Sequence, residues 1–126
     1  MYEEDFVKQE IVDLNIEGYE EGSFKYKPTT AGQENEWLEK YMKYDNVSKE
    51  FKQDFAVLNK LKLGNVVKVP YSDEQLKKIT GLDKSWDNYS VEEKWVVFGQ
   101  LKSVVFDRIL DAINKYDKGS DAPKKV

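Results

Sequence analysis

Residues 22–44, GSFKYKPTTAGQENEWLEKYMKY, carry the clearest structural signals in this chain. In the segment FKYK the aromatic residues alternate with lysines, which is the period of a strand with one buried face. Pro28 lacks a backbone donor and ends that strand. Thr30 precedes Gln33 by three residues, the spacing of a reciprocal helix cap. We therefore expect a strand that stops at Pro28 and a helix that begins at Thr30.

The helix after Thr30 is predicted to continue to about Tyr44. Apolar residues recur along it at spacings of one, three and four, opposite a charged face. They are Trp37, Leu38, Tyr41, Met42 and Tyr44. Trp37 is the largest of them, so we expect it to anchor the core.

A second strand is predicted before this segment. Apolar and polar residues alternate between Ile11 and Ile16, and the acidic run GYEEG follows. The two strands form a β-hairpin at about residues 11–27. Two strands alone are marginal in water, so this hairpin must pack on a helix or find a third strand. Residues 66–69 are β-prone and end at Pro70, which suits a short third strand or an extended crossing.

Three further helices are expected downstream. Ser48 is placed to cap a helix that runs to about Leu63, with Gly64 closing it in a left-handed conformation. Ser72 and Gln75 start a short helix that ends at Gly81. The longest apolar period covers residues 90–116, and we expect it to bend or break between residues 100 and 103.

The sequence thus predicts an α+β fold, a mostly helical single domain with an N-terminal β-hairpin at residues 11–116. Residues 1–10 are expected to be a flexible arm and residues 117–126 a disordered tail. The predicted core consists of Trp37, Leu38, Phe55, Leu58, Trp95, Phe98, Ile109 and Ile113.

The amino-acid composition limits the classes of function that this chain can have. The chain has 126 residues, a formal charge of −4, and neither histidine nor cysteine. An acidic balance argues against nucleic-acid binding, because that affinity depends on Lys and Arg. The missing residue types exclude thiol nucleophiles and the commonest catalytic base and metal ligand. We expect no enzymatic activity, no metal and no cofactor. No secretion signal or membrane span is evident, so a cytoplasmic location is expected.

Aromatic residues beside breaks in regular structure are the candidate protein-binding sites. Trp86 and Tyr89 lie in the polar segment LDKSWDNY, and Tyr44 lies at the end of the first helix. Amphipathic aromatics in such places are common protein-contact anchors. The alternative is that they cover the core. For FKYK, too, an aromatic face on the core is favoured over nucleic-acid stacking. The acids near residues 83–93 are read as a solvated loop and helix start.

The segment FKYKPTTAGQENEW, after a hairpin and before a run of amphipathic helices, resembles tail assembly chaperones of long-tailed phages. The resemblance rests on Tyr26, Lys27, Pro28, Thr29 and Thr30, where an aromatic and basic strand meets a Pro-Thr pair and a capped helix. It implies a non-enzymatic protein in the host cytoplasm that binds the long, helical tape measure protein during tail assembly. It also implies possible homo-oligomers.

Two other non-enzymatic classes remain open. One is another small phage or viral structural protein, which would be found in the finished particle. The other is an acidic adaptor that binds one host protein. An enzyme would require a concave site with convergent carboxylates and lysine.

Overall fold

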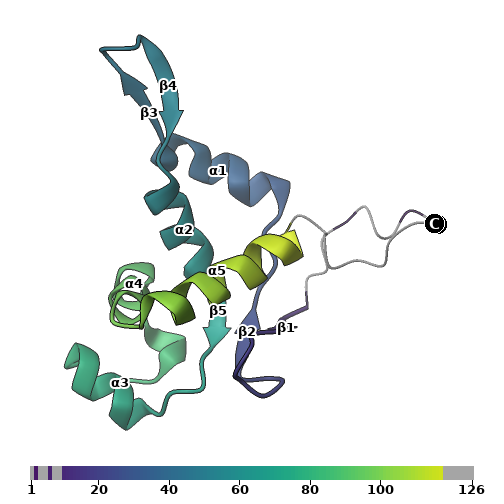
Figure 1. The fold of residues 1–126 in the computed structure, drawn as a ribbon, viewed down its shortest axis with the longest axis vertical. Coiled ribbons are helices and arrows are strands. Elements are labelled where there is room, and N and C mark those ends of the chain that lie inside the picture. Colours follow the sequence, from purple (N-terminus) through teal and green to yellow (C-terminus); the bar gives the residue numbers. More distant parts are fainter. Residues whose placement is uncertain (1, 3–5, 7–9, 118–126) are drawn as a thin grey trace.

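The structure, a computed structural model, describes Tyr2, Phe6 and residues 10–117 (Figure 1). These residues form five α-helices, one 3-10 helix and five strands. In chain order they are β1 (Val12–Leu14), β2 (Phe24–Tyr26), α1 (Ala31–Tyr41), β3 (Met42–Asp45), β4 (Glu50–Gln53), α2 (Phe55–Leu63), β5 (Val66–Lys68), α3 (Asp73–Thr80), η2 (Trp86–Asn88), α4 (Val91–Gly99) and α5 (Ser103–Asp117). The predicted α+β, mostly helical class is confirmed.

The two predicted ends fall largely outside the described residues. Of the arm 1–10, the structure describes positions 2, 6 and 10 alone, and of the tail 117–126 it describes Asp117 alone. Asp117 does not belong to a tail. It is the last residue of α5.

The predicted N-terminal hairpin and third strand are confirmed. Strands β1 and β2 pair antiparallel with Leu14 opposite Phe24, and β5 adds to the other side of β2 with Val66 opposite Tyr26. The resulting sheet has the order β1-β2-β5. Phe24 and Tyr26 are both completely buried, as the alternation in FKYK predicts.

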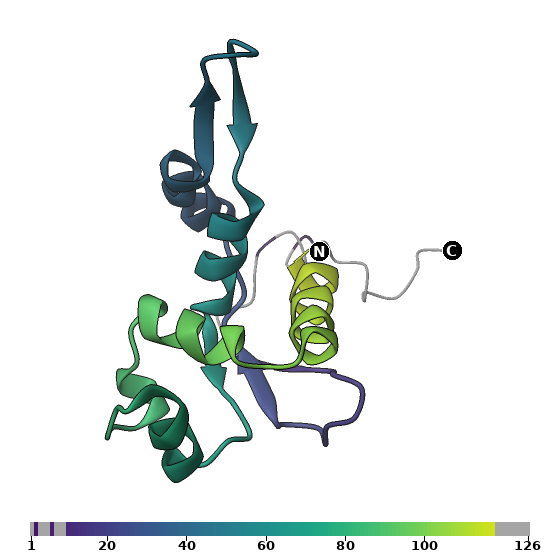
Figure 2. The ribbon, with the colours of Figure 1, turned by 60° about the vertical axis from the view of Figure 1, so that its left-hand side comes forward.

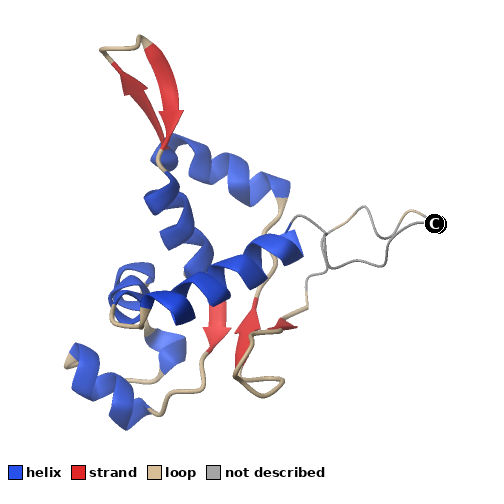
Figure 3. Ribbon diagram, in the orientation of Figure 1, coloured by secondary structure: helices blue, strands red, loops and turns tan. Residues whose placement is uncertain are grey.

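Helices α4 and α5 and the η2 segment lie around this sheet and complete the core (Figure 3). The buried cluster contains Leu14, Ile16, Phe24, Tyr26, Leu63, Val66, Val69, Leu76, Trp86, Tyr89, Val97, Phe98, Ile109, Leu110, Ala112 and Ile113. The long apolar period at 90–116 is split into α4 and α5 after Gly99, where a break was expected. We call the sheet, α3, η2, α4 and α5 the body.

Side-chain caps start three of the helices as predicted. The Thr30 hydroxyl accepts from the Gln33 N–H at 3.1 Å, and Ser72 and Ser90 form complete capping boxes. At Thr30 only the first hydrogen bond of the capping box forms, from the Gln33 N–H to the Thr30 hydroxyl. The Gln33 side chain exchanges hydrogen bonds with the amide of Asn65, which ties the start of α1 to the residue before β5.

The glycines that end α2 and α3 act differently. Gly81 ends α3 in the predicted left-handed conformation, with φ 76°. Gly64 ends α2 but keeps a right-handed conformation, φ −62°, so that prediction was wrong. Its role is close packing, because a Cβ there would come within 2.8 Å of the Val91 side chain on α4.

The largest departure from the predicted fold lies at residues 42–54. The first helix ends at Tyr41, and the second begins at Phe55 with Asp54 as its cap. Neither the helical end at Tyr44 nor the Ser48 cap exists. Residues 42–53 instead form an antiparallel hairpin, β3–β4, that projects from the ends of α1 and α2 (Figure 1, Figure 2).

The predicted core is only partly confirmed. Phe98, Ile109 and Ile113 are fully buried, whereas Leu58 and Trp95 are half-buried. Leu38 is 41% exposed, so its placement in the core was wrong. It follows Trp37 by about 100° around the helix, which turns it away when Trp37 faces inward. The Phe55 side chain lies outside the described part of the structure.

Trp37 is buried, at 8% exposure, but it is not part of the central cluster. Helices α1 and α2 pack against each other in the region between the body and the β3–β4 hairpin. The predicted role of Trp37 as the anchor of the main core is therefore replaced by one in this second, smaller packing region.

A buried polar network fixes the end of α5 to the sheet. The Tyr26 hydroxyl lies 3.0 and 2.9 Å from the two carboxylate oxygens of Asp117 and 2.7 Å from the Thr29 hydroxyl. Lys62 of α2 forms an ion pair with the same carboxylate at 3.1 Å and donates to Asn114 at 3.2 Å. Burial raises the pKa of Tyr26 well above its ordinary value of 10.0.

Candidate protein-binding surface

The β3–β4 hairpin presents an exposed apolar face that no other described element covers. Its register places Met42 opposite Gln53 and Tyr44 opposite Phe51, so Tyr44 and Phe51 share one face. Their rings pack edge to face, with centroids 5.3 Å apart. Tyr44 is 50% and Phe51 67% exposed. A large aromatic pair thus faces solvent at a distance from the body.

The turn of this hairpin is stabilised by its first residue. The Asp45 carboxylate accepts from the backbone N–H of Val47 at 2.8 Å, and its carbonyl accepts from the Lys49 N–H at 2.7 Å. Lys49 has φ 60°, a left-handed conformation that is unusual outside glycine. Val47 stands at the tip and is 94% exposed. The turn thus holds an apolar side chain in solvent at the end of the hairpin.

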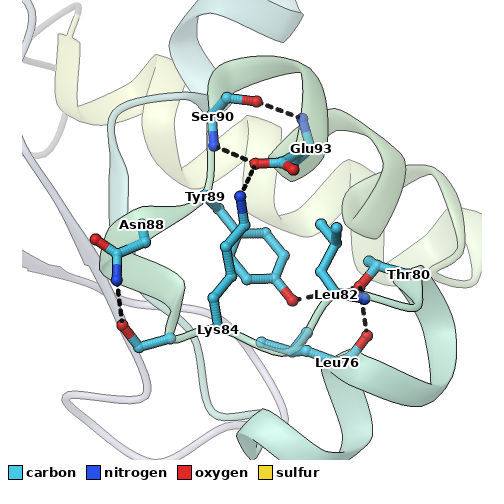
Figure 4. A network of polar contacts seen from close by, with 9 residues as sticks. Leu76, Thr80, Leu82, Lys84, Asn88, Tyr89, Ser90 and Glu93 are labelled. Atoms are coloured by element: carbon cyan, nitrogen blue, oxygen red, sulfur yellow. Dashed lines mark hydrogen bonds and ion pairs between the residues drawn. The ribbon is translucent and has the colours of Figure 1, made fainter.

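Trp86 and Tyr89, predicted as possible contact residues, are core residues. They are 7% and 6% exposed, and their rings lie 5.2 Å apart. The Trp86 indole N–H donates to the Val66 carbonyl of β5 at 3.0 Å. The Tyr89 hydroxyl lies 3.3 Å from that of Thr80, which itself donates to the Leu76 carbonyl (Figure 4). Their polar tips are therefore used inside the fold, and the alternative that they cover the core holds.

Lys94 is a buried cation with a structural environment. Its ammonium donates to the carbonyls of Gly64 and Val66, at 3.1 and 2.9 Å, and lies 5.2 Å from the centre of the Trp86 ring. Burial lowers its pKa, and the Asp87 carboxylate partly opposes this. Since carbonyls and a ring face occupy its surroundings, Lys94 joins α4 to β5.

Glu93 belongs to a second local cluster, drawn in Figure 4. It accepts from the Ser90 N–H at 2.9 Å as part of the α4 capping box and from the Lys84 ammonium at 2.7 Å. The hydrogen bond from Lys84, followed by that from Ser90, lowers the pKa of Glu93. These contacts fix the loop before α4.

Acidic side chains elsewhere in the described part of the chain do not cluster into a metal site. Among the described residues, no group of three or more Asp or Glu side chains is placed to hold a metal ion. An open depression of about 320 Å³ beside the β1–β2 loop is lined by Asp13, Leu14, Asn15, Tyr19, Glu20 and Glu21. No helix in the described part of the chain is long and apolar enough to cross a membrane.

No family model matches this chain, and no curated protein or solved structure is significantly similar to it. Of the three predicted contact residues, Tyr44 alone is exposed, and the structure places it beside Phe51 rather than beside Trp86 or Tyr89.

Sequence reasoning missed Phe51 and Val47 as surface residues. A signal for the hairpin was nonetheless present. Lys43-Tyr44-Asp45 and Glu50-Phe51-Lys52 both alternate charged and aromatic residues, which is a strand period. The helical spacing from Phe51 through Leu61 obscured it.

Proposed function

We propose that this chain is a non-enzymatic tail assembly chaperone of a long-tailed phage, acting in the host cytoplasm, and that the β3–β4 hairpin contacts its client. The client is a long helical polypeptide with exposed apolar residues, the tape measure protein. The observation that carries the proposal is the exposed aromatic pair on the hairpin, Tyr44 and Phe51.

The chemistry of the hairpin suits a protein client. Aromatic residues contribute large contact areas at low conformational cost and are enriched among the residues that dominate protein interfaces. Val47, at the turn between the two strands, is 94% exposed and extends the apolar surface. A helix with apolar residues on one face would cover Tyr44 and Phe51 along the hairpin.

The resemblance to tail assembly chaperones has a local structural counterpart. In its segment, the strand β2 ends at Tyr26, and α1 begins behind the Thr30 cap. This is the order of strand, Pro-Thr pair and capped helix on which the resemblance rests, and it supports the proposal at the level of local structure.

Co-expression tests the proposal. The chain would be expressed with the tape measure protein encoded beside its gene, and the soluble fraction of that protein measured. We expect the native chain to keep it soluble and the double variant Tyr44→Ser/Phe51→Ser to lose most of this effect. The matched control is Val104→Ser on α5, since Val104 is 51% exposed but lies off the hairpin.

Two results would contradict the proposal. If the native chain and the double variant keep the tape measure protein equally soluble, the hairpin is not the contact surface. If the native chain does not keep it soluble, the chaperone role is wrong. Presence of the chain in purified finished particles would favour a structural protein instead. Specific binding to one host protein would favour an adaptor.

The gene offers an independent test. Many genes of the family that the chain resembles carry a slippery adenine-rich run near the stop codon, and the codons of residues 123–125, Pro-Lys-Lys, could contain such a run. We expect such a run, an overlapping downstream frame and a neighbouring tape measure gene. If all three are missing, the chaperone function should be abandoned for an unassigned binding module.

A further inference from the structure

Met42 is the one methionine in the described part of the chain, and it stands where α1 passes directly into β3. The whole chain has two methionines, Met1 and Met42, and no cysteine, so these two side chains carry all of its sulfur. A thioether is a common target of oxidation, which converts a flexible apolar side chain into a polar sulfoxide. The position of Met42 therefore decides what such a change would affect in this structure.

Met42 belongs to the same face of the hairpin as the aromatic pair. Its backbone is extended, with φ −90° and ψ 128°, so the alternation of the strand begins at this residue. Met42 and Tyr44 are two residues apart in β3, and Phe51 stands opposite Tyr44. Residues two apart in a strand point to the same side, at a spacing of about 6.6 Å. Met42 thus extends the apolar face towards the base of the hairpin.

The extended face suits a helical client. The spacing between Met42 and Tyr44 is close to the roughly 5–6 Å between neighbouring side chains three or four residues apart on a helix. Met42 keeps part of its surface in solvent, so a partner can cover it further. A methionine side chain is flexible and polarisable, and such side chains adapt to clients of varied sequence.

The body, in contrast, has no sulfur at its centre. Among the described residues, neither the buried cluster nor the partly buried side chains packed against it include a methionine. Oxidation can therefore change the polarity of the hairpin face without placing a sulfoxide in the main core. The hairpin face and the body thus differ in their sensitivity to an oxidant.

We infer that Met42 is a third client contact beside Tyr44 and Phe51, and that oxidation of its sulfur by a peroxide weakens client binding. The inference rests on the proposed function, because the client is the one named there. Hydrogen peroxide transfers one oxygen atom to the thioether. The O–O bond breaks, the S–O bond forms, the sulfur is oxidised by two electrons, and the other peroxide oxygen leaves as water. The sulfoxide then places a polar group in an apolar contact, which disfavours its burial.

The first experiment uses the full chain without a client. After treatment with dilute hydrogen peroxide, peptide mass spectrometry should find one added oxygen at Met42, and circular dichroism should show an unchanged fold. Hydrophobic-interaction chromatography should then show earlier elution of the oxidised native chain. The control is Met42→Leu, which keeps Met1 and a side chain of similar volume, so its elution should shift less.

The second experiment measures the client. The tape measure protein is diluted from denaturant in the presence of the purified chain, and its aggregation is followed by light scattering. Oxidation should raise the chain concentration that halves the scattering by on the order of tenfold, the effect of losing one apolar contact. Met42→Gln should behave like the oxidised chain without any peroxide. Met42→Leu should stay active after peroxide, and methionine sulfoxide reductases should restore the oxidised native chain.

Three results would overturn the inference: no oxygen at Met42 in the folded chain, the same elution shift in native chain and Met42→Leu, or undiminished client protection by the chain oxidised at Met42. Failure of the unoxidised native chain to protect the client is a different result. It contradicts the proposed function and the client contact with it, while mapping and chromatography still decide whether Met42 is an oxidation site on this face.

Discussion

The described part of the molecule contains two antiparallel hairpins with the same alternation of charged and aromatic residues but different environments. In β1–β2, Phe24 and Tyr26 are completely buried under the helices of the body. In β3–β4, Tyr44 and Phe51 remain at least half exposed. The alternation therefore specifies a strand in both places. What differs is whether another layer covers the aromatic face.

In the body, the aromatic face of the hairpin is covered by segments that are distant in the sequence. The sheet gains a third strand, β5, and its aromatic face packs against residues of α4 and α5, far along the chain. The second hairpin is flanked by α1 and α2, which pack on each other instead. Alternation alone thus cannot separate a core strand from an interaction strand.

The largest expected effect compares one phenylalanine from each hairpin. Phe24→Ala should lower the free energy of unfolding by about 3–5 kcal/mol, because it leaves a cavity in the buried cluster. Phe51→Ala should lower it by less than about 1 kcal/mol, since Phe51 is 67% exposed and loses only its cross-strand contact with Tyr44. Urea denaturation of dilute protein measures both. Similar losses for the two variants would show that β3–β4 is part of the cooperative core.

The next effect concerns the polar network under β2. Asp117→Ala leaves the buried Lys62 ammonium without its carboxylate and should cost about 2–3 kcal/mol in the free energy of unfolding. Asp111→Ala on the exposed face of α5 is the control and should cost little. Equal stability of the two variants would mean that Asp117 does not fix α5 to the sheet.

Alkaline pH should test the same network. The pKa of Tyr26 is raised in the folded state, so its phenol ionises near pH 10 in the unfolded chain and only at higher pH in the folded one. Its contribution to stability is therefore complete below about pH 10 and is lost as the pH rises further. Denaturation from pH 8 to 11 should show a steeper loss in the native chain than in Tyr26→Phe. Parallel curves would contradict this.

The smallest effect belongs to the exposed turn. Lys49 occupies a left-handed conformation that glycine adopts without strain, so Lys49→Gly should stabilise the β3–β4 hairpin locally. We expect amide exchange at residues 43–52 to slow a few-fold while global stability changes by less than about 0.5 kcal/mol. Faster exchange in the hairpin would show that the turn does not limit its opening.

The sequence predicted what local signals determine. The caps at Thr30, Ser72 and Ser90, the strand ending before Pro28 and the break after Gly99 all depend on residues within one turn or strand, and all occur. The second hairpin was mistaken for helix because Tyr41, Tyr44, Phe51 and Phe55 also fit a helical period. The turn at Asp45 favours two paired strands over a continuous helix. Its hydrogen bonds depend on a backbone geometry that the residue pattern alone does not show.

The candidate site was less predictable for a related reason. Tyr44, Trp86 and Tyr89 look alike in sequence, as aromatics beside breaks. Trp86 is buried where β5 offers its indole N–H a carbonyl 20 residues away in the sequence and the Lys94 ammonium lies over its ring. Tyr44 has no such cover among the described residues, and its exposure becomes visible only once the fold is assembled.

The Val66 carbonyl, which accepts from both the Trp86 indole and the Lys94 ammonium, also bears on aggregation. Because this carbonyl already accepts hydrogen bonds, it cannot accept one from a strand of another chain. Aggregation of misfolded chains onto the outer edge of β5 is therefore disfavoured. Replacing Lys94 with a shorter residue would free part of this edge. Strand-mediated precipitation during heating would then start from the body as well.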